Sequence, residues 1–209
     1  MKKNVQVKNK IELKLIIVGD VATGKTSIIN RFINNTFEDN SITTIVPNYS
    51  NKVITINDTI YYINIWDIPG QDRNPIVTRS FANGTNGIIY CFEVNNVNSG
   101  INLNNWEESL KSFEDIENVP KIIIENKSDL IENEIDFNNN VNFLKERSEQ
   151  LSCLNFFITS AKTGSNINDA MYFIINEMIK NNKEENVQIY NQIKLNKNKN
   201  TNPNAHRCC

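Results

Sequence analysis

The stretch Gly19-Asp20-Val21-Ala22-Thr23-Gly24-Lys25-Thr26 decides the fold of this chain. It has the phosphate-loop pattern G-x-x-x-x-G-K-[ST], and it lies between a predicted buried strand, 11–18, and a predicted helix, 25–33. The two glycines allow a tight turn whose N–H groups face phosphate oxygens, and the helix N-terminus adds positive potential. Lys25 supplies a charge for the β and γ phosphates, and the Thr26 hydroxyl is a ligand for Mg²⁺. The sequence therefore predicts a P-loop.

Strand and helix patterns alternate along most of the chain. Several strand candidates are continuous apolar runs, which are typical of strands covered on both faces. The alternation predicts an α/β fold with a six-stranded, mainly parallel sheet, one antiparallel strand and helices on both faces. The antiparallel strand comes from a hairpin, because only Asn57, Asp58 and Thr59 separate two strands. The further predicted strands are 52–56, 60–66, 87–92, 121–125 and 155–159, and the further helices are 103–113, 137–151 and 167–179.

Composition and length fit one domain with a polar tail. The chain has 209 residues and a net charge of −2, so it lacks the basic field of a nucleic-acid-binding protein. We expect a domain over 1–180 and a flexible tail over 181–209, where Asn, Lys and Glu replace the apolar pattern. No apolar run has the roughly 18 residues of a spanning helix, and the start does not resemble a signal peptide, so we expect a cytosolic protein. Cys91 and Cys153 lie in apolar stretches and are predicted to be reduced, buried thiols.

Three further motifs follow predicted strands. They are Asp67-Ile68-Pro69-Gly70-Gln71, Asn126-Lys127-Ser128-Asp129 and Ser160-Ala161-Lys162. Ligands of open α/β sheets bind outside the carboxyl ends of the strands, so these motifs are expected to surround the P-loop. Asp67 is a carboxylate that can hold Mg²⁺ through water, and the Gly70 N–H can reach a γ-phosphate.

With these motifs in order, residues 11–179 resemble the Ras superfamily of small GTPases, which have a P-loop NTPase fold called the G-domain. The resemblance implies that Asp129 accepts hydrogen bonds from guanine, that Lys127 and Phe37 pack near the base, and that the Ala161 N–H meets the guanine oxygen. Adenine lacks the two matching donors, and an unpaired carboxylate costs about 1–3 kcal/mol, so GTP and GDP are favoured over ATP. The implied nucleotide-binding residues are Gly19, Val21, Ala22, Thr23, Gly24, Lys25, Thr26, Ser27, Phe37, Thr44, Asp67, Gly70, Asn126, Lys127, Asp129, Ser160, Ala161 and Lys162.

The resemblance also implies a switch. Thr44 matches the threonine that ligates Mg²⁺ together with Thr26 and Asp67 when GTP is bound, and losing the γ-phosphate releases it. Gln71 matches the glutamine that orients the attacking water. Catalysis is therefore expected to rest on Gln71, Lys25 and Thr44.

Within the superfamily the chain is most similar to Rab GTPases. Tyr49, Trp66 and Phe81 match an aromatic trio that reports nucleotide state to effectors, although three ordinary core aromatics are the alternative. The ending His206-Arg207-Cys208-Cys209 resembles a double geranylgeranyl site at Cys208 and Cys209. Two lipid chains anchor a protein stably, so we expect the cytosolic face of an intracellular membrane, with cycling to the cytosol. The implied partners are an exchange factor, a GTPase-activating protein, effectors, a GDP-dissociation inhibitor and a prenyltransferase.

The P-loop departs from the family at Val21 and Ala22, where glycine or another small residue is usual. Val21 is expected beside the γ-phosphate, where bulk hinders Gln71 or an arginine finger. Two functions stay open: a switch that hydrolyses GTP in vesicle trafficking, and a GTP-binding scaffold with little hydrolysis. Val46, Pro69, Asp72 and Asn74-Pro75 also differ from the family and predict unusual partners.

Overall fold

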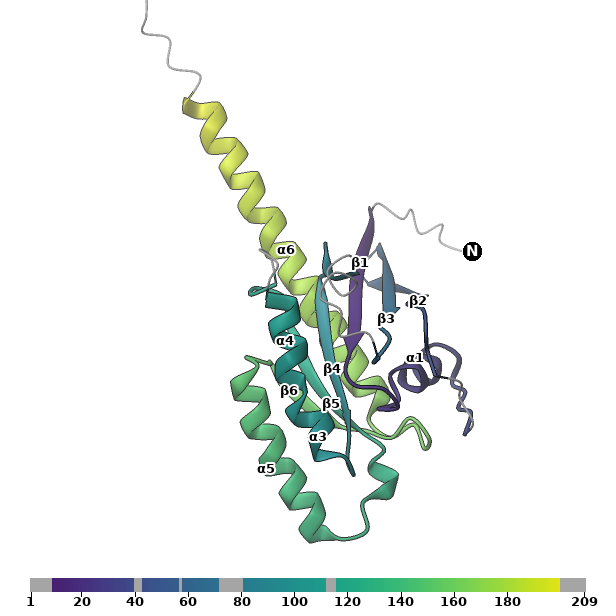
Figure 1. Ribbon diagram of the computed structural model, residues 1–209. Helices are drawn as coiled ribbons and strands as arrows, with labels where there is room; N and C mark the ends of the chain where they lie inside the picture. The colour runs from purple at the N-terminus through teal and green to yellow at the C-terminus, as the bar shows by residue number, and fades with distance from the viewer. Residues whose placement is uncertain (1–8, 40–42, 57, 72–80, 112–115, 200–209) are drawn as a thin grey trace, which may run out of the picture.

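The computed structural model describes residues 9–39, 43–56, 58–71, 81–111 and 116–199, with side chains as far as Lys183. One six-stranded sheet runs through the domain in the order β2-β3-β1-β4-β5-β6 (Figure 1). The strands are β1 (Asn9–Val18), β2 (Asn48–Ile56), β3 (Thr59–Asp67), β4 (Gly87–Glu93), β5 (Lys121–Asn126) and β6 (Asn155–Ile158). The helices are α1 (Lys25–Asn34), α3 (Val97–Ile101), α4 (Leu103–Lys111), η1 (Ser128–Leu130), α5 (Glu134–Gln150) and α6 (Ile167–Lys199).

The sheet confirms the predicted mixture of strand directions. β1 pairs in parallel with β3 and β4, and β5 pairs in parallel with β4 and β6. Only the β2–β3 hairpin is antiparallel among the described strands. Asp58 turns that hairpin with a φ of 63°, a left-handed conformation that Asp tolerates better than most residues. Because β1, β3, β4, β5 and β6 all point the same way, their carboxyl ends share one edge of the domain.

Each face of the sheet has its own hydrophobic core. On one face, alternate residues of β1 such as Leu15 pack with Ile28 of α1 and Ile174 of α6. On the other face, Ile16 packs with Trp106 of α4 and Leu144 of α5. The apolar runs of β4 and β5 are buried almost throughout, as expected for strands covered on both sides.

Two helices differ from the predicted bounds. α5 begins three residues before the predicted 137, because Asn133 caps it by accepting a hydrogen bond from the Asp136 N–H at 3.0 Å. α6 continues to Lys199, twenty residues past the predicted end at 179, and it projects away from the sheet (Figure 1). Residues 180–199 are rich in Asn and Lys and contain no Gly or Pro, so no strongly helix-breaking residue stops the helix. The short α3 and η1 were not predicted, since neither has a full period of apolar residues.

Within the described ranges, no helix combines the length and the apolar character needed to cross a membrane.

Candidate nucleotide-binding site

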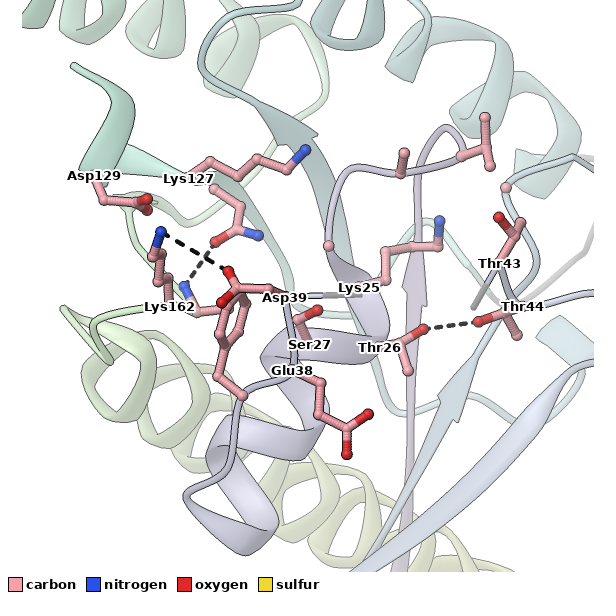
Figure 2. Close-up of a pocket in the computed structure, with 17 residues that line it drawn as sticks. Lys25, Thr26, Ser27, Glu38, Asp39, Thr43, Thr44, Lys127, Asp129 and Lys162 are labelled. Atoms are coloured by element: carbon pink, nitrogen blue, oxygen red, sulfur yellow. Dashed lines mark hydrogen bonds and ion pairs between the residues drawn. The ribbon is translucent and has the colours of Figure 1, made fainter. Parts of the chain in front are cut away.

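A cavity of about 300 Å³ opens at the carboxyl edge of the sheet (Figure 2). The P-loop forms its floor, the segment after α1 forms one wall, and the loops after β5 and β6 form the other. Fourteen of the eighteen predicted nucleotide-binding residues thus meet at one place, although they span positions 21 to 162 of the chain. The lining residues are Val21, Ala22, Gly24, Lys25, Thr26, Ser27, Phe37, Glu38, Asp39, Thr43, Thr44, Gly70, Asn126, Lys127, Asp129, Ala161 and Lys162.

The backbone of the P-loop is held in the shape that phosphate binding requires. Gly24 has a φ of +89° and directly precedes α1, so the first N–H groups of that helix face the cavity. A Cβ at Gly24 would lie 2.2 Å from the Asn126 side chain, and a Cβ at Gly19 would lie 1.9 Å from the Cys91 carbonyl oxygen. Both positions therefore require glycine. Ala22 has a φ of 64°, a conformation that is strained for a residue with a Cβ.

Lys25 is the buried cation of the loop. Its ammonium donates to the carbonyl oxygens of Gly19 and Asp20, both at 2.9 Å, and the residue is only 6% exposed. Burial lowers the pKa of Lys25, and the nearby Cys91, Asp67 and Asp20 side chains oppose that shift. A phosphate in the cavity would supply the anionic partner that the two carbonyl oxygens replace only in part.

Three oxygen atoms converge beside Lys25, as predicted for a magnesium site. Thr26 Oγ1 lies 2.8 Å from Thr44 Oγ1 and donates to Asp67 Oδ2 at 2.5 Å, while Thr44 Oγ1 lies 3.4 Å from the same carboxylate oxygen (Figure 2 shows the Thr26–Thr44 contact). Asp67 is 3% exposed, burial raises its pKa, and its Oδ1 is buried without a hydrogen-bond partner. Hydroxyl and carboxylate oxygens around a buried, incompletely satisfied carboxylate fit Mg²⁺. No cluster of three His, Cys, Asp or Glu side chains that could hold a metal occurs in the described part of the chain.

Asn126 joins the floor of the cavity to the wall formed by the loops after β5 and β6. Its Nδ2 donates to the Thr23 carbonyl oxygen at 3.0 Å, and its Oδ1 accepts from the Ala161 N–H at 3.1 Å and from Thr159 Oγ1 at 3.3 Å. The P-loop, the end of β5 and the loop after β6 are therefore tied together through one side chain that is 1% exposed. In this arrangement the Ala161 N–H, which the resemblance assigns to the guanine oxygen, donates within the protein.

The predicted base-reading residues lie at the far end of the cavity. Ser160 Oγ donates to Asp129 Oδ1 at 2.5 Å, and it accepts from the Thr163 N–H at 3.1 Å, so the carboxylate is oriented from behind. Lys127 has a left-handed φ of 67° and forms an ion pair with Glu93 at the end of β4. Four predicted nucleotide-binding residues do not line the cavity but contact residues that do: Gly19, Thr23, Asp67 and Ser160.

The segment after α1 contributes residues that sequence reasoning missed. Glu38, Asp39 and Thr43 line the cavity beside the predicted Phe37 and Thr44. Asp39 Oδ1 lies 3.8 Å from Lys162 Nζ across the opening, as the dashed line in Figure 2 marks. Both side chains are more than half exposed, so this pair contributes little to stability. The only sequence signal for the Asp39–Lys162 pair was the opposite charge of the two side chains.

Gly70 and Val21 meet where the γ-phosphate is expected. A Cβ at Gly70 would lie 2.3 Å from the Val21 backbone nitrogen, so the two backbones are in direct contact. The Val21 side chain is 41% exposed and lines the cavity. Gln71 follows at an exposed position, and the departures at Asp72 and Asn74-Pro75 lie outside the described residues.

The predicted aromatic trio is a contiguous group. The Trp66 ring centroid lies 5.6 Å from that of Tyr49 and 5.5 Å from that of Phe81, and Lys14 Nζ lies 5.2 Å from it. Tyr49 is 51% exposed, so the trio reaches the surface and is not simply part of the core. The predicted lipidation sites Cys208 and Cys209 lie outside the described residues, whereas Cys91 is buried and Cys153 partly buried, both as free thiols.

Comparisons with known proteins agree with this geometry. A family model described as the Ras family matches residues 14–180. Ras-related protein Rab7 of Cenchrus ciliaris is 32% identical over 185 residues, which cover 85% of this chain and 87% of that protein. Ras-related protein RabG2 of Dictyostelium discoideum is 30% identical over 80% of this chain and 83% of its own length, and RABG3c of Arabidopsis thaliana is 34% identical over 87% and 89%. With its P-loop, its mainly parallel sheet and these relatives, the chain belongs to the Ras superfamily of small GTPases, as a Rab-like member.

Proposed function

We propose that this protein is a Rab-like molecular switch that binds GTP and GDP, hydrolyses GTP and recruits effectors in intracellular membrane traffic. The observation that carries the proposal is the single cavity that joins a P-loop, a hydroxyl–carboxylate cluster and Asp129. These three parts bind phosphate, Mg²⁺ and guanine respectively. The relatives named Rab7 and RabG support the placement of this activity in trafficking.

Guanine selectivity rests on Asp129. The Ser160 hydroxyl occupies one of its oxygens, which fixes the carboxylate plane and leaves acceptor capacity for the two donors on one edge of guanine. Adenine presents no such pair, so binding it would leave this carboxylate poorly satisfied. Competition of GTP and ATP for the purified protein tests this point: GTP should displace bound GDP at a concentration at least about tenfold lower than ATP, and equal potency would refute the guanine reading.

Phosphate chemistry is assigned to the opposite end of the cavity. Thr26, Thr44 and Asp67 would hold Mg²⁺, which supplies charge compensation for the β and γ phosphates. Lys25 neutralises the same phosphates, and Gln71 orients a water molecule in line with the bond to the leaving GDP. By the family resemblance, Thr44 would contact Mg²⁺ only when the γ-phosphate is present, which makes the segment around Thr44 the surface that differs between the GTP and GDP states.

Hydrolysis is the step on which the two candidate functions differ. Val21 lines the cavity between Gly70 and the phosphate end, and its branched side chain occupies space that Gln71 or a partner's arginine would use. This observation supports the alternative, a GTP-binding scaffold that hydrolyses little. Both candidates require the same nucleotide pocket.

Single-turnover phosphate release separates the two candidates. For a working switch, the preloaded GTP complex releases phosphate at the slow intrinsic rate of small GTPases, and Val21→Gly raises that rate by about tenfold or less. For a scaffold, release is undetectable, and Val21→Gly restores it only if the side chain is the cause. Val53→Gly is the matched control, because Val53 is 53% exposed on β2 and does not line the cavity.

Membrane attachment and regulation complete the proposed cycle. Geranylgeranyl chains on Cys208 and Cys209, added by a prenyltransferase, would hold the protein on the cytosolic face of an intracellular membrane. A GDP-dissociation inhibitor would return it to the cytosol, and an exchange factor and a GTPase-activating protein would act on the switch segments. A tagged chain that lacks both cysteines should lose its membrane association in cell fractionation, and retention on membranes would refute the lipid assignment.

A further inference from the structure

Asp20 is a P-loop residue whose side chain is bound by the segment that contains α3 and α4. Its Oδ2 accepts from Asn102 Nδ2 at 2.6 Å, and its Oδ1 accepts from Trp106 Nε1 at 3.1 Å. Asn102 lies between α3 and α4, and Trp106 lies within α4 with 1% exposure. Both carboxylate oxygens are therefore fixed by the α3–α4 segment, more than 80 positions away in the chain.

The backbone of the same residue holds the functional groups of the loop. The Asp20 carbonyl oxygen accepts from Lys25 Nζ at 2.9 Å and from Thr23 Oγ1 at 3.0 Å. It also lies against Gly70, since a Cβ there would be 2.4 Å from the Asp20 carbonyl carbon. A shift of Asp20 would thus move the partner of Lys25 and the surface on which Gly70 rests.

The residues that flank Asp20 in the loop restrict its backbone only weakly. Asp20 follows Gly19, whose φ is +146°, and it precedes the exposed Val21 and the strained Ala22. Glycine and an exposed loop residue restrict the backbone weakly. Hydrogen bonds to a charged carboxylate are stronger than neutral ones, and those from a buried indole have a fixed direction.

We propose that Asp20 is a positioning residue through which the α3–α4 segment fixes the P-loop backbone and the position of Lys25. By fixing them, it sets the lifetime of bound nucleotide. The proposal rests on the proposed function, because it concerns the nucleotide pocket. It assigns α4 a part in nucleotide release, although none of its residues lines the cavity.

The dissociation rate of a fluorescent GDP analogue from the full-length protein, in Mg²⁺ and excess unlabelled GDP, tests this coupling. Asp20→Ala removes both acceptors and should speed dissociation by about tenfold or more. Trp106→Phe removes one donor while retaining an aromatic ring and should speed it by about threefold or more. The double variant should accelerate dissociation by clearly less than the product of the two single accelerations, because both changes remove the Trp106–Asp20 hydrogen bond.

Tyr90→Phe is the matched control. It removes another buried hydrogen bond on the same face of the sheet, from the Tyr90 hydroxyl to Glu107 of α4, which does not involve the P-loop. Its dissociation rate should stay within about twofold of wild type. An equal acceleration in this variant would show general loosening of α4 and overturn the proposal, as would an unchanged rate in Asp20→Ala. If Asp20→Ala does not fold, Trp106→Phe decides by the same criteria.

A spectroscopic measurement separates positioning from a purely structural role. The chain has two tryptophans, so Trp66→Phe leaves Trp106 as the sole indole reporter. Removal of Mg²⁺ and GDP should then change the Trp106 emission, and Asp20→Ala should abolish that change. Absence of the change in the folded Trp66→Phe protein would overturn the coupling. A wild-type protein that binds no GDP would instead refute the proposed function, which is a different result.

Discussion

Replacing Asn126 by alanine should destabilise the whole domain, because this side chain joins the P-loop to the end of the sheet. The change removes the donor to the Thr23 carbonyl oxygen and the acceptor of the Ala161 N–H and of Thr159 Oγ1, at 3.0, 3.1 and 3.3 Å. Water does not replace the lost partners, since Asn126 is 1% and Ala161 2% exposed.

The expected loss follows from the three bonds. Each intramolecular hydrogen bond contributes about 1 kcal/mol net, which gives about 3 kcal/mol together. The Thr23 carbonyl oxygen keeps the Cys91 thiol as a donor, and Thr159 Oγ1 keeps the Glu125 carbonyl oxygen, both with long bonds. The buried Ala161 N–H is left without an acceptor, so the loss of this hydrogen bond should cost more of the free energy of unfolding than the loss of either of the other two.

Thermal unfolding without added nucleotide measures this loss, because Asn126 also lines the nucleotide cavity and a change in GDP affinity would itself shift Tm. For a domain of this size, about 3 kcal/mol lowers Tm by roughly 6 to 12 °C. Asn142→Ala is the control, because Asn142 is exposed on α5 and alanine has the higher helix propensity, so its Tm should be unchanged or slightly raised. A fall of less than about 3 °C in Asn126→Ala would refute the view that this residue ties the P-loop to the loops after β5 and β6.

Three further changes are expected to have defined effects. Gly19→Ala places a Cβ 1.9 Å from the Cys91 carbonyl oxygen and should lower the free energy of unfolding by more than about 3 kcal/mol in urea titration. Ala22→Gly relieves a left-handed conformation that costs about 1–2 kcal/mol, and the extra conformational entropy of unfolded glycine offsets about 0.5–1 kcal/mol of that gain. The free energy of unfolding from urea titration should therefore rise by roughly 0.5–1 kcal/mol. Burial raises the pKa of Glu125 from 4.5 to about 7, so the folded state keeps its proton where the unfolded chain has lost it. The contribution of Glu125 to the free energy of unfolding is therefore fully present below about pH 4.5 and is lost, by about 3 kcal/mol in all, as the pH rises to about 7. Glu125→Gln should remove this pH dependence. An unchanged slope of stability against pH between about pH 5 and 8 in that variant would contradict the assignment of the slope to Glu125.

The sequence predicted the strands and the P-loop because their signals are local. The β4 and β5 runs are continuous and apolar, and the short hairpin turn defines the one antiparallel pair. The motif residues after β1, β3, β5 and β6 meet because parallel strands bring their carboxyl ends to one edge, which the alternation of strands and helices already implied.

Other features depend on contacts that no local pattern encodes. The hydrogen bonds of Asp20 join positions far apart in the chain, and Asp is equally at home in a solvated loop. The extension of α6 to Lys199 was missed because the loss of an apolar face was read as the end of the helix, whereas a polar segment without Gly or Pro can continue it. The division into a domain over 1–180 and a tail over 181–209 stays a proposal.

The wide spacing of the cavity residues has a consequence for protein synthesis. The P-loop follows the first strand, but its ties through Asn126 and Ala161 come from the last two strands. Translation adds residues from the N-terminus, so the loop leaves the ribosome long before the groups that complete its pocket. Because GDP stabilises only chains that hold the finished site, cellular nucleotide can assist folding only after Lys162 has emerged. Until then the nascent chain folds without that stabilisation.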